Sequence, residues 1–138
     1  MKDVFCKIID GEIPCSKVYE DDDVLAILDI SQTTKGHTLV IPKEHYDSFL
    51  SCPEETMAKV MLVAQRIGQA EISILGAKGV NILTNCGEAA GQSVPHFHVH
   101  VIPRYLGGEG GFQLTMKSQD TSGMDLPLLA KEIGEAMK

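Results

Sequence analysis

Apolar residues in the first third of the chain fall into short runs that predict β-strands. Residues 16–20 form one short run, and residues 22–30 hold a nearly continuous apolar stretch between acidic residues. A continuous run of this length is typical of a strand that is buried on both faces. Residues 37–43 (HTLVIPK) form a further β-rich run that stops at Pro42, and residues 33–36 before it indicate a turn. We expect the second and third runs to pair.

The middle of the chain predicts one long helix. Its apolar positions recur at helical spacing; they are Met57, Val60, Met61, Ala64, Ile67, Ile74 and Leu75. Ser51 is expected to cap the helix, with Pro53 in the first turn and Glu54 completing a capping box. Gly76 and Gly79 are expected to end it.

Two more strands are predicted after this helix. Residues 79–85 (GVNILTN) alternate in polarity, as a half-buried strand does. Residues 88–92 (EAAGQ) indicate a loop. Residues 96–102 give the clearest strand pattern in the chain, and we expect this strand to end at Pro103.

The C-terminal part predicts a loop and a short helix. Residues 106–124 contain GGEGG and are expected to form a flexible loop, and residues 125–138 to form the helix. Since the strands are separated by turns rather than each by a helix, the order favours an α+β fold with an antiparallel sheet. We expect a single domain over residues 1–138, because no repeat or change of composition divides the chain.

Composition narrows the functional classes. The net charge of −7 argues against a nucleic-acid-binding protein, which normally carries a basic face. No apolar stretch approaches the roughly 20 residues of a membrane-spanning helix. Acidic residues at positions 3, 10 and 12 rule out a signal peptide at the N-terminus, and the four cysteines form no CxxC pair. We therefore expect a cytoplasmic protein with reduced thiols, without membrane or nucleic-acid partners.

The histidines are concentrated in two short windows. All five lie in HTLVIPKEH or HFHVH; they are His37, His45, His96, His98 and His100. In a strand, the last three would share one face, while Phe97, Val99 and Val101 point into the core. Three imidazoles in register are a poor packing solution because each carries polar nitrogens that need partners. The pattern therefore indicates a functional site.

Two kinds of chemistry fit this histidine pattern. Alternating histidines bind metal in some zinc enzymes. Alternatively, one imidazole is a nucleophile whose neighbours orient it and handle protons. Gly91, Gln92 and Ser93 precede the histidines and can offer N–H and hydroxyl groups to phosphate oxygens, and no carboxylate lies within HFHVH to complete a metal shell. These features favour the nucleophile.

The segment His96-Phe-His98-Val-His100-Val-Ile resembles the signature of the histidine triad (HIT) family, HφHφHφφ, where φ is apolar. The resemblance extends to FCKIIDGEIP from residue 5, EDDDVLAILD from residue 20, GHTLVIPKEH from residue 36 and GQSVPH from residue 91. It covers roughly residues 3–105. The order of the motifs is similar to that of the bacterial-type branch, which includes nucleoside phosphoramidases and dinucleoside polyphosphate hydrolases.

The resemblance implies a fold and an activity. The fold is a five-stranded antiparallel sheet with two helices, paired across a homodimer into a ten-stranded sheet. The substrate is a small-molecule nucleoside phosphate derivative, usually of adenosine. His98 would attack the α-phosphorus and form a nucleotidyl-histidine intermediate, from which water releases the nucleoside monophosphate. His100 would contact the phosphate and assist the leaving group, while His96 and His37 orient the nucleophile.

The resemblance also implies a binding site. Asn85, Gly91 and Ser93 match positions that contact phosphate, and Asp29 matches a position that binds ribose hydroxyls. The positions that wall the base pocket are Val4, Phe5, Ile8, Ile27, Leu28 and Ile30. Each has a structural alternative: Asp29 a turn cap, Asn85 a strand-end residue, Ser93 a loop hydroxyl, and the apolar residues core positions.

A metal site is a further implication. Some relatives bind zinc with CxxC and two histidines, so the corresponding residues here would be Asp3, Cys6, His45 and His96, with a carboxylate in place of one thiolate. The chemistry itself requires no cofactor, and zinc would be a structural ion. Gln32 is another departure, since it replaces a proline that is common in the family, and we expect only local effects.

Several related functions remain open. A dinucleoside polyphosphate hydrolase is one alternative to a phosphoramidase. Another is a dimeric binding or regulatory protein that turns nucleotides over slowly. Two other branches fit less well. The galactose-1-phosphate uridylyltransferase branch usually has glutamine where this chain has His100, and its members are much longer. The DNA-repair branch adds nucleic-acid-binding modules that this sequence does not show.

Overall fold

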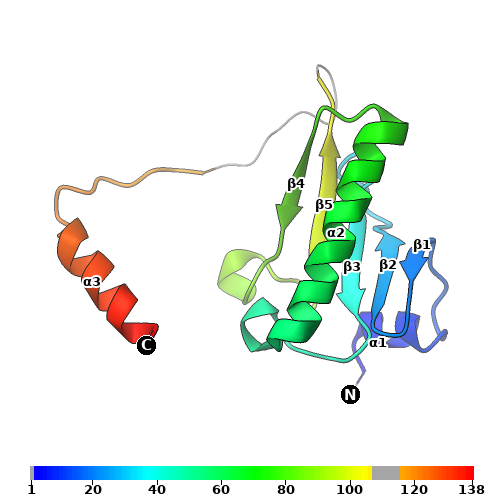
Figure 1. Cartoon of the computed structure of the whole chain (residues 1–138), viewed down its shortest axis with the longest axis horizontal. Coiled ribbons are helices and arrows are strands. Elements are labelled where there is room, and N and C mark those ends of the chain that lie inside the picture. Colours follow the sequence, from blue (N-terminus) through cyan, green and yellow to red (C-terminus); the bar gives the residue numbers. More distant parts are fainter. Residues whose placement is uncertain (1, 107–115) are drawn as a thin grey trace.

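The computed structural model describes residues 2–106 and 116–138 (Figure 1). The elements in chain order are α1 (Val4–Ile9), β1 (Lys17–Glu20), β2 (Val24–Leu28), β3 (Thr38–Pro42), η1 (Phe49–Ser51), α2 (Glu54–Leu75), β4 (Gly79–Leu83), η2 (Glu88–Ala90), β5 (Val99–Arg104) and α3 (Leu126–Ala136). Most of the predicted flexible loop, residues 107–115, lies outside the described residues.

The five strands form one antiparallel sheet in the order β1-β2-β3-β5-β4. The predicted pairing of the second and third runs is confirmed, with Val24 opposite Pro42 and Leu28 opposite Thr38. The α+β prediction is therefore confirmed. Among the described residues, no helix is both long and apolar enough to cross a membrane.

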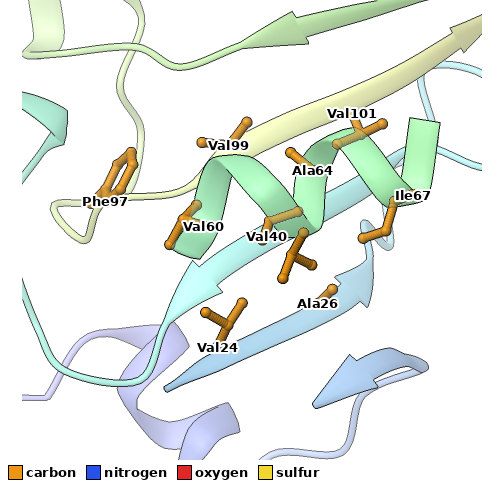
Figure 2. Close-up of a cluster of buried hydrophobic side chains, with 10 residues drawn as sticks. Val24, Ala26, Val40, Val60, Ala64, Ile67, Phe97, Val99 and Val101 are labelled. Carbon is orange, nitrogen blue, oxygen red and sulfur yellow. The ribbon is translucent and has the colours of Figure 1, made fainter. Parts of the chain in front are cut away.

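Helices cover parts of both faces of the sheet, which explains why β2 and β3 are apolar throughout. Val24, Ala26 and Val40 point to α2 and pack with its buried residues (Figure 2). The alternate residues, such as Leu25 and Ile41, form a second cluster with Phe5 of α1 and Ile27 and Leu39. Core packing fills the contact between α2 and the sheet, and His98 and His100 face the α1 side.

The last strand begins later than predicted. β5 starts at Val99, so of the triad only His100 lies within it. His96 and Phe97 instead bond to the end of β3 and the turn after it: His96 Nε2–H donates to Pro42 O at 3.0 Å, and Phe97 N–H donates to Tyr46 O at 2.7 Å. Pro103 does not end the strand, because β3 pairs only with residues 99–101 and requires no N–H from it.

The capping box predicted for the long helix was wrong. Ser51 belongs to η1, where it forms a capping box with Ser48, and α2 follows Pro53 without a side-chain cap. Gly76 ends α2 in the left-handed conformation, as expected, whereas Gly79 begins β4. The pattern also did not predict α1 or the short helix η2 inside the 88–92 loop.

The predicted C-terminal helix is confirmed as α3, and it is set apart from the sheet (Figure 1). Asp125 caps it by accepting a hydrogen bond from Leu128 N–H at 3.1 Å. All of its side chains are exposed, including large apolar ones.

Candidate active site

A cavity of about 280 Å³ lies on the α1 face of the sheet. The predicted site residues that line it are Val4, Phe5, Ile8, Ile27, Leu28, Asp29, Ile30, Ser93, His98 and His100. Sequence reasoning missed Ile13, Pro14, Cys15, Leu39 and Val94. Leu39 carried a signal in its strand pattern, and Ile13, Pro14 and Val94 lie in segments that resemble the family, whereas Cys15 carried neither signal.

The backbone carbonyl of His96 holds His98 in a single tautomer. Its Nδ1 lies 2.7 Å from His96 O, and a carbonyl can only accept, so Nδ1 carries the proton. Nε2 is therefore unprotonated and has a free lone pair. Burial lowers the pKa of His98, so the ring is neutral at pH 7. A buried neutral imidazole with its Nε2 lone pair available is a nucleophile at neutral pH.

Hydrogen bonds also fix the tautomers of His37 and His100. Thr33 N–H donates to His37 Nδ1 at 3.2 Å, so His37 carries its proton on Nε2. That proton points to His100 Nδ1 at 2.9 Å, which places the remaining proton of a neutral His100 on Nε2. Burial, with His98 and His37 nearby, lowers the pKa of His100 to about 4. His100 therefore offers an N–H donor at the cavity without a charge.

The turn before β3 sets the position of His37, and Gln32 organises it. Gln32 Nε2 donates to His37 O at 2.7 Å, and its Oε1 accepts from Gly36 N–H at 2.8 Å. Gly36 has a φ of +107°, and a Cβ there would lie 2.8 Å from Glu71 Oε2. The residue that departs from the family pattern is thus part of the support of the site.

Asp29 has both of the roles considered from the sequence within reach. Its Oδ1 caps the turn by accepting from Ser31 N–H at 2.8 Å. Its Oδ2 lies 3.6 Å from His37 Nε2, and the residue lines the cavity. The turn cap leaves Oδ2 available for a ligand hydroxyl.

The loop before the triad separates the three predicted phosphate contacts. Ser93 lines the cavity, whereas Asn85 Nδ2 donates to Gly91 O at 3.4 Å. Gly91 has a φ of +94°, which favours glycine. Gln92 ties the loop down, donating from Nε2 to Asp47 O at 2.6 Å. Asn85 and Gly91 therefore shape the loop that carries Ser93, and their phosphate contacts stay predictions.

Phe5 joins the cavity to a second group of polar residues. Its ring makes edge contacts with His98, at 4.9 Å between centroids, and with His96, at 5.8 Å. Phe5 is buried, while Ile30, another predicted wall residue, is 99% exposed. Ile30 therefore stands at the mouth of the cavity, with its side chain open to solvent.

Beyond Phe5, Asp3, Cys6, His45 and His96 converge as predicted, with one ligand atom from each within 4.8 Å of the others. Asp3 Oδ2 is 3.0 Å from His45 Nδ1 and 3.2 Å from His96 Nδ1. Cys6 Sγ is 3.7 Å and 3.6 Å from the same two nitrogens. Asp3 also caps α1, accepting from Cys6 N–H at 2.8 Å, which fixes both side chains on one helix turn.

This cluster fits a zinc ion. Tetrahedral zinc ligands at about 2.0–2.3 Å from the metal lie about 3.3–3.8 Å from each other, close to the separations here. The hydrogen bonds also favour a cation. His96 Nε2–H donates to Pro42 O, so in neutral His96 the Nδ1 lone pair faces the Asp3 carboxylate. A shared cation would remove that repulsion.

A second group, Asp29, His37 and His100, has metal-like spacing but different hydrogen bonding. His37 Nε2–H donates to His100 Nδ1, so the two nitrogens satisfy each other. The hydrogen bonds therefore explain this group without an ion. Both carboxylates come from outside HFHVH, so its lack of an acidic residue did not decide the metal question.

Comparisons with known proteins agree with this geometry. The chain matches the HIT domain family over residues 10–107. It is 37% identical to adenosine 5'-monophosphoramidase hnt1 of Schizosaccharomyces pombe, with all of both chains covered. A crystal structure of a HIT family protein from Bacillus anthracis str. 'Ames Ancestor' matches with a TM-score of 0.88 and 47% identity, over 98% of this chain and 96% of the other. A Zn-bound histidine triad family protein from Mycobacterium smegmatis matches with a TM-score of 0.75 and 42% identity, over 96% of each chain.

Proposed function

Because the chain belongs to the HIT domain family, we propose that it is a nucleotide hydrolase or transferase that acts on the α-phosphate of adenosine phosphoramidates and releases AMP. The observation that carries the proposal is the tautomer of His98. Its Nδ1–H is held by His96 O, and its Nε2 lone pair is left for the phosphorus. The name of the fission-yeast relative supports the adenosine phosphoramidate class.

The reaction proceeds in two displacements. His98 Nε2 attacks the α-phosphorus, the Nε2–P bond forms, and the bond from phosphorus to the leaving nitrogen breaks as that nitrogen takes up a proton from solvent. Nδ1–H keeps its bond to His96 O while the ring becomes positively charged. Water then attacks the same phosphorus, the Nε2–P bond breaks, AMP leaves, and the proton that the water loses returns to solvent. Splitting the hydrolysis in this way lowers the barrier of each step.

His100 and His37 act as a fixed donor pair in this scheme. Since His100 Nδ1 accepts from His37, His100 Nε2–H is directed to the phosphate oxygen or the leaving atom. A hydrogen bond that strengthens as charge develops lowers the barrier without a change in the protonation of His100.

The cavity supports the choice of a nucleoside. Its apolar wall, with Phe5 and Ile27, suits the faces of a purine ring. Asp29 at the same cavity suits the two hydroxyls of a ribose, because a carboxylate can accept from both. Ser93 can donate its hydroxyl to a phosphate oxygen.

Zinc belongs to this proposal as a structural ion. Asp3, Cys6, His45 and His96 would hold it, with ionised sulfur as the strongest ligand. The name of the mycobacterial relative supports the metal. The ion would fix α1 against the turn after β3 and the triad segment, and so hold Phe5 in the cavity wall.

The test is a rapid acid quench of the protein with adenosine 5'-phosphoramidate, followed by intact-mass and peptide mass spectrometry. The expected result is an adenylyl adduct on the His98 peptide that is absent in His98→Ala. A parallel reaction with a diadenosine polyphosphate compares the two leaving-group classes. AMP release by the wild type, with no adduct on any peptide at quench times shorter than one turnover, would contradict the covalent mechanism.

A further inference from the structure

The terminal helix α3 presents an apolar face that no described part of the chain covers. The apolar stripe follows helical spacing and consists of Leu126, Leu129, Ala130, Ile133 and Met137, all exposed. Glu132 and Glu135 lie on the other side of the helix with Leu128. An isolated helix of 11 residues is marginal in water. The stripe therefore needs a partner surface if α3 is to persist.

An apolar groove of matching character lies on the α2 face of the sheet, and of its described lining residues only Leu28 also lines the cavity at His98. Its volume is about 490 Å³. Its apolar lining includes Val63, Ile67, Ala70 and Ile74 of α2, Val18 of β1 and Leu28 of β2. Val18, Leu28 and Ile74 are exposed. Its charged lining residues are Lys35, Arg66 and Glu71.

The position of α3 points away from its own groove. Figure 1 shows α3 beyond the β4 edge of the sheet, whereas the groove lies between α2 and the β1 edge. The position is not peculiar to this chain. Residues 116–138 make up a sixth of it, so a TM-score of 0.88 over 98% of the chain requires α3 to lie in a similar place in the Bacillus anthracis crystal structure.

We propose that the apolar face of α3 docks into the groove between α2 and β1–β2 of a second copy of this chain, so that two copies exchange their C-terminal helices. The helix is about 16 Å long, which suits the span of α2 from Val63 to Ile74 along the groove. The exchange is reciprocal, as in a two-fold symmetric dimer. It does not depend on the chemistry of His98.

Hydrogen exchange of α3 in the full-length protein tests the contact. In the wild type, the amides of α3 should exchange at least ~100-fold more slowly than in an unstructured chain, because docking protects them. Ala70→Arg, which fills the groove from the exposed side of α2, and Ile133→Asp, in the centre of the stripe, should each remove that protection. Leu128→Asp places the same charge on the opposite side of α3 and should leave the protection unchanged.

Mixing the two damaged chains distinguishes a second copy from the same chain. The Ala70→Arg chain keeps an intact α3, and the Ile133→Asp chain keeps an intact groove. If the helices are exchanged, the mixture restores protection to α3 of the Ala70→Arg chain, which mass spectrometry separates from its partner.

Three results would overturn the proposal. The first is an unprotected α3, or a monomer by light scattering, in the wild type. The second is protection that survives Ala70→Arg, which would place α3 on another surface. The third is a mixture in which no protection returns, which would place α3 in the groove of its own chain.

Discussion

Two groups of histidines and carboxylates flank His98, and they differ in how their protons are placed. In Asp29–His37–His100, each hydrogen bond has a donor and an acceptor, so the tautomers are defined. In Asp3–Cys6–His45–His96, Asp3 Oδ2 lies against two imidazole nitrogens while His96 already donates from Nε2 to Pro42 O. The same residue types thus produce a proton-ordered group in one place and, in the other, a group whose arrangement suits a cation.

The spacing of the ligand atoms therefore does not decide which of the two groups suits a metal ion and which suits catalysis. Both groups bring their ligand atoms within 4.8 Å of one another. The difference comes from backbone contacts, Thr33 N–H on His37 and Pro42 O on His96, which decide which nitrogen keeps a proton. Changes to each group should therefore affect different observables.

The largest expected effect is on the residue between the groups. His98→Ala removes the proposed nucleophile, so kcat/KM for adenosine 5'-phosphoramidate should fall by ~10⁴-fold or more. Single-turnover release of AMP measures it, with thermal unfolding to verify the fold. A variant that kept more than about 1% of the wild-type rate would assign the attack to another group.

The second prediction concerns a buried acid that lacks the partners found in both groups. Glu71 is 6% exposed, its Oε1 has no hydrogen-bond partner among the described residues, and burial raises its pKa from 4.5 to about 7. The native state then holds a proton that the unfolded state has released between these values. The free energy of unfolding should fall as pH rises from about 4.5 to about 7, by about 3 kcal/mol from this group.

Glu71→Gln should remove that slope, because an amide does not titrate. The measurement is urea unfolding at several pH values, taken as the difference between wild type and variant so that other groups cancel. Two curves that run parallel from pH 4 to pH 8 would show that Glu71 is paired or hydrated in solution.

A third change separates the two groups directly. His37→Ala removes the donor to His100 Nδ1 and frees that ring to rotate, so kcat should fall about 10–100-fold with little change in KM. The matched variant His45→Ala removes a histidine from the other group. It should lower metal content and leave kcat within about threefold at a temperature where the protein is folded. Equal losses of kcat in both variants would show that the two groups do not differ in their effect on the reaction.

The smallest expected effect is on stability. Cys6→Ser should weaken the proposed zinc site, so the bound metal measured by mass spectrometry should fall below one per chain. Thermal unfolding should then occur several degrees lower, for a loss of about 1–2 kcal/mol. A chelator should lower the wild type to a similar temperature and leave the variant unchanged. A wild type purified without metal and insensitive to added zinc would count against the site.

Much of the fold could be predicted because it depends on local patterns. The runs in β2 and β3 and the period of α2 showed the sheet and its helix directly. The start of β5 could not be predicted, because His96 and Phe97 have a strand-like sequence but bond to the end of β3 and the following turn. The predicted cap of α2 was wrong for a related reason, because Ser51 belongs to η1 and completes the capping box of that helix.

The sequence predicted which residues form the candidate site, but not which nitrogen of each histidine carries the proton. The histidine spacing and the family resemblance named the residues that meet at the cavity. The tautomer of His98 depends on the carbonyl of His96, and that of His37 on the amide of Thr33. Such contacts follow from backbone conformation, which a residue pattern does not encode. The contacts of Gln32 are local, as expected, but its role in the turn could not be predicted, because its three backbone contacts exist only once the turn has formed.

The ring of Phe5, which touches both His96 and His98, gives the protein a natural place for an optical probe. The chain contains no tryptophan, so Phe5→Trp would introduce a single indole at the junction of the two groups. Its emission would change when a cation loads beside His96 and again when a nucleotide base enters beside His98. One fluorescence titration could then follow the order in which the two ligands bind.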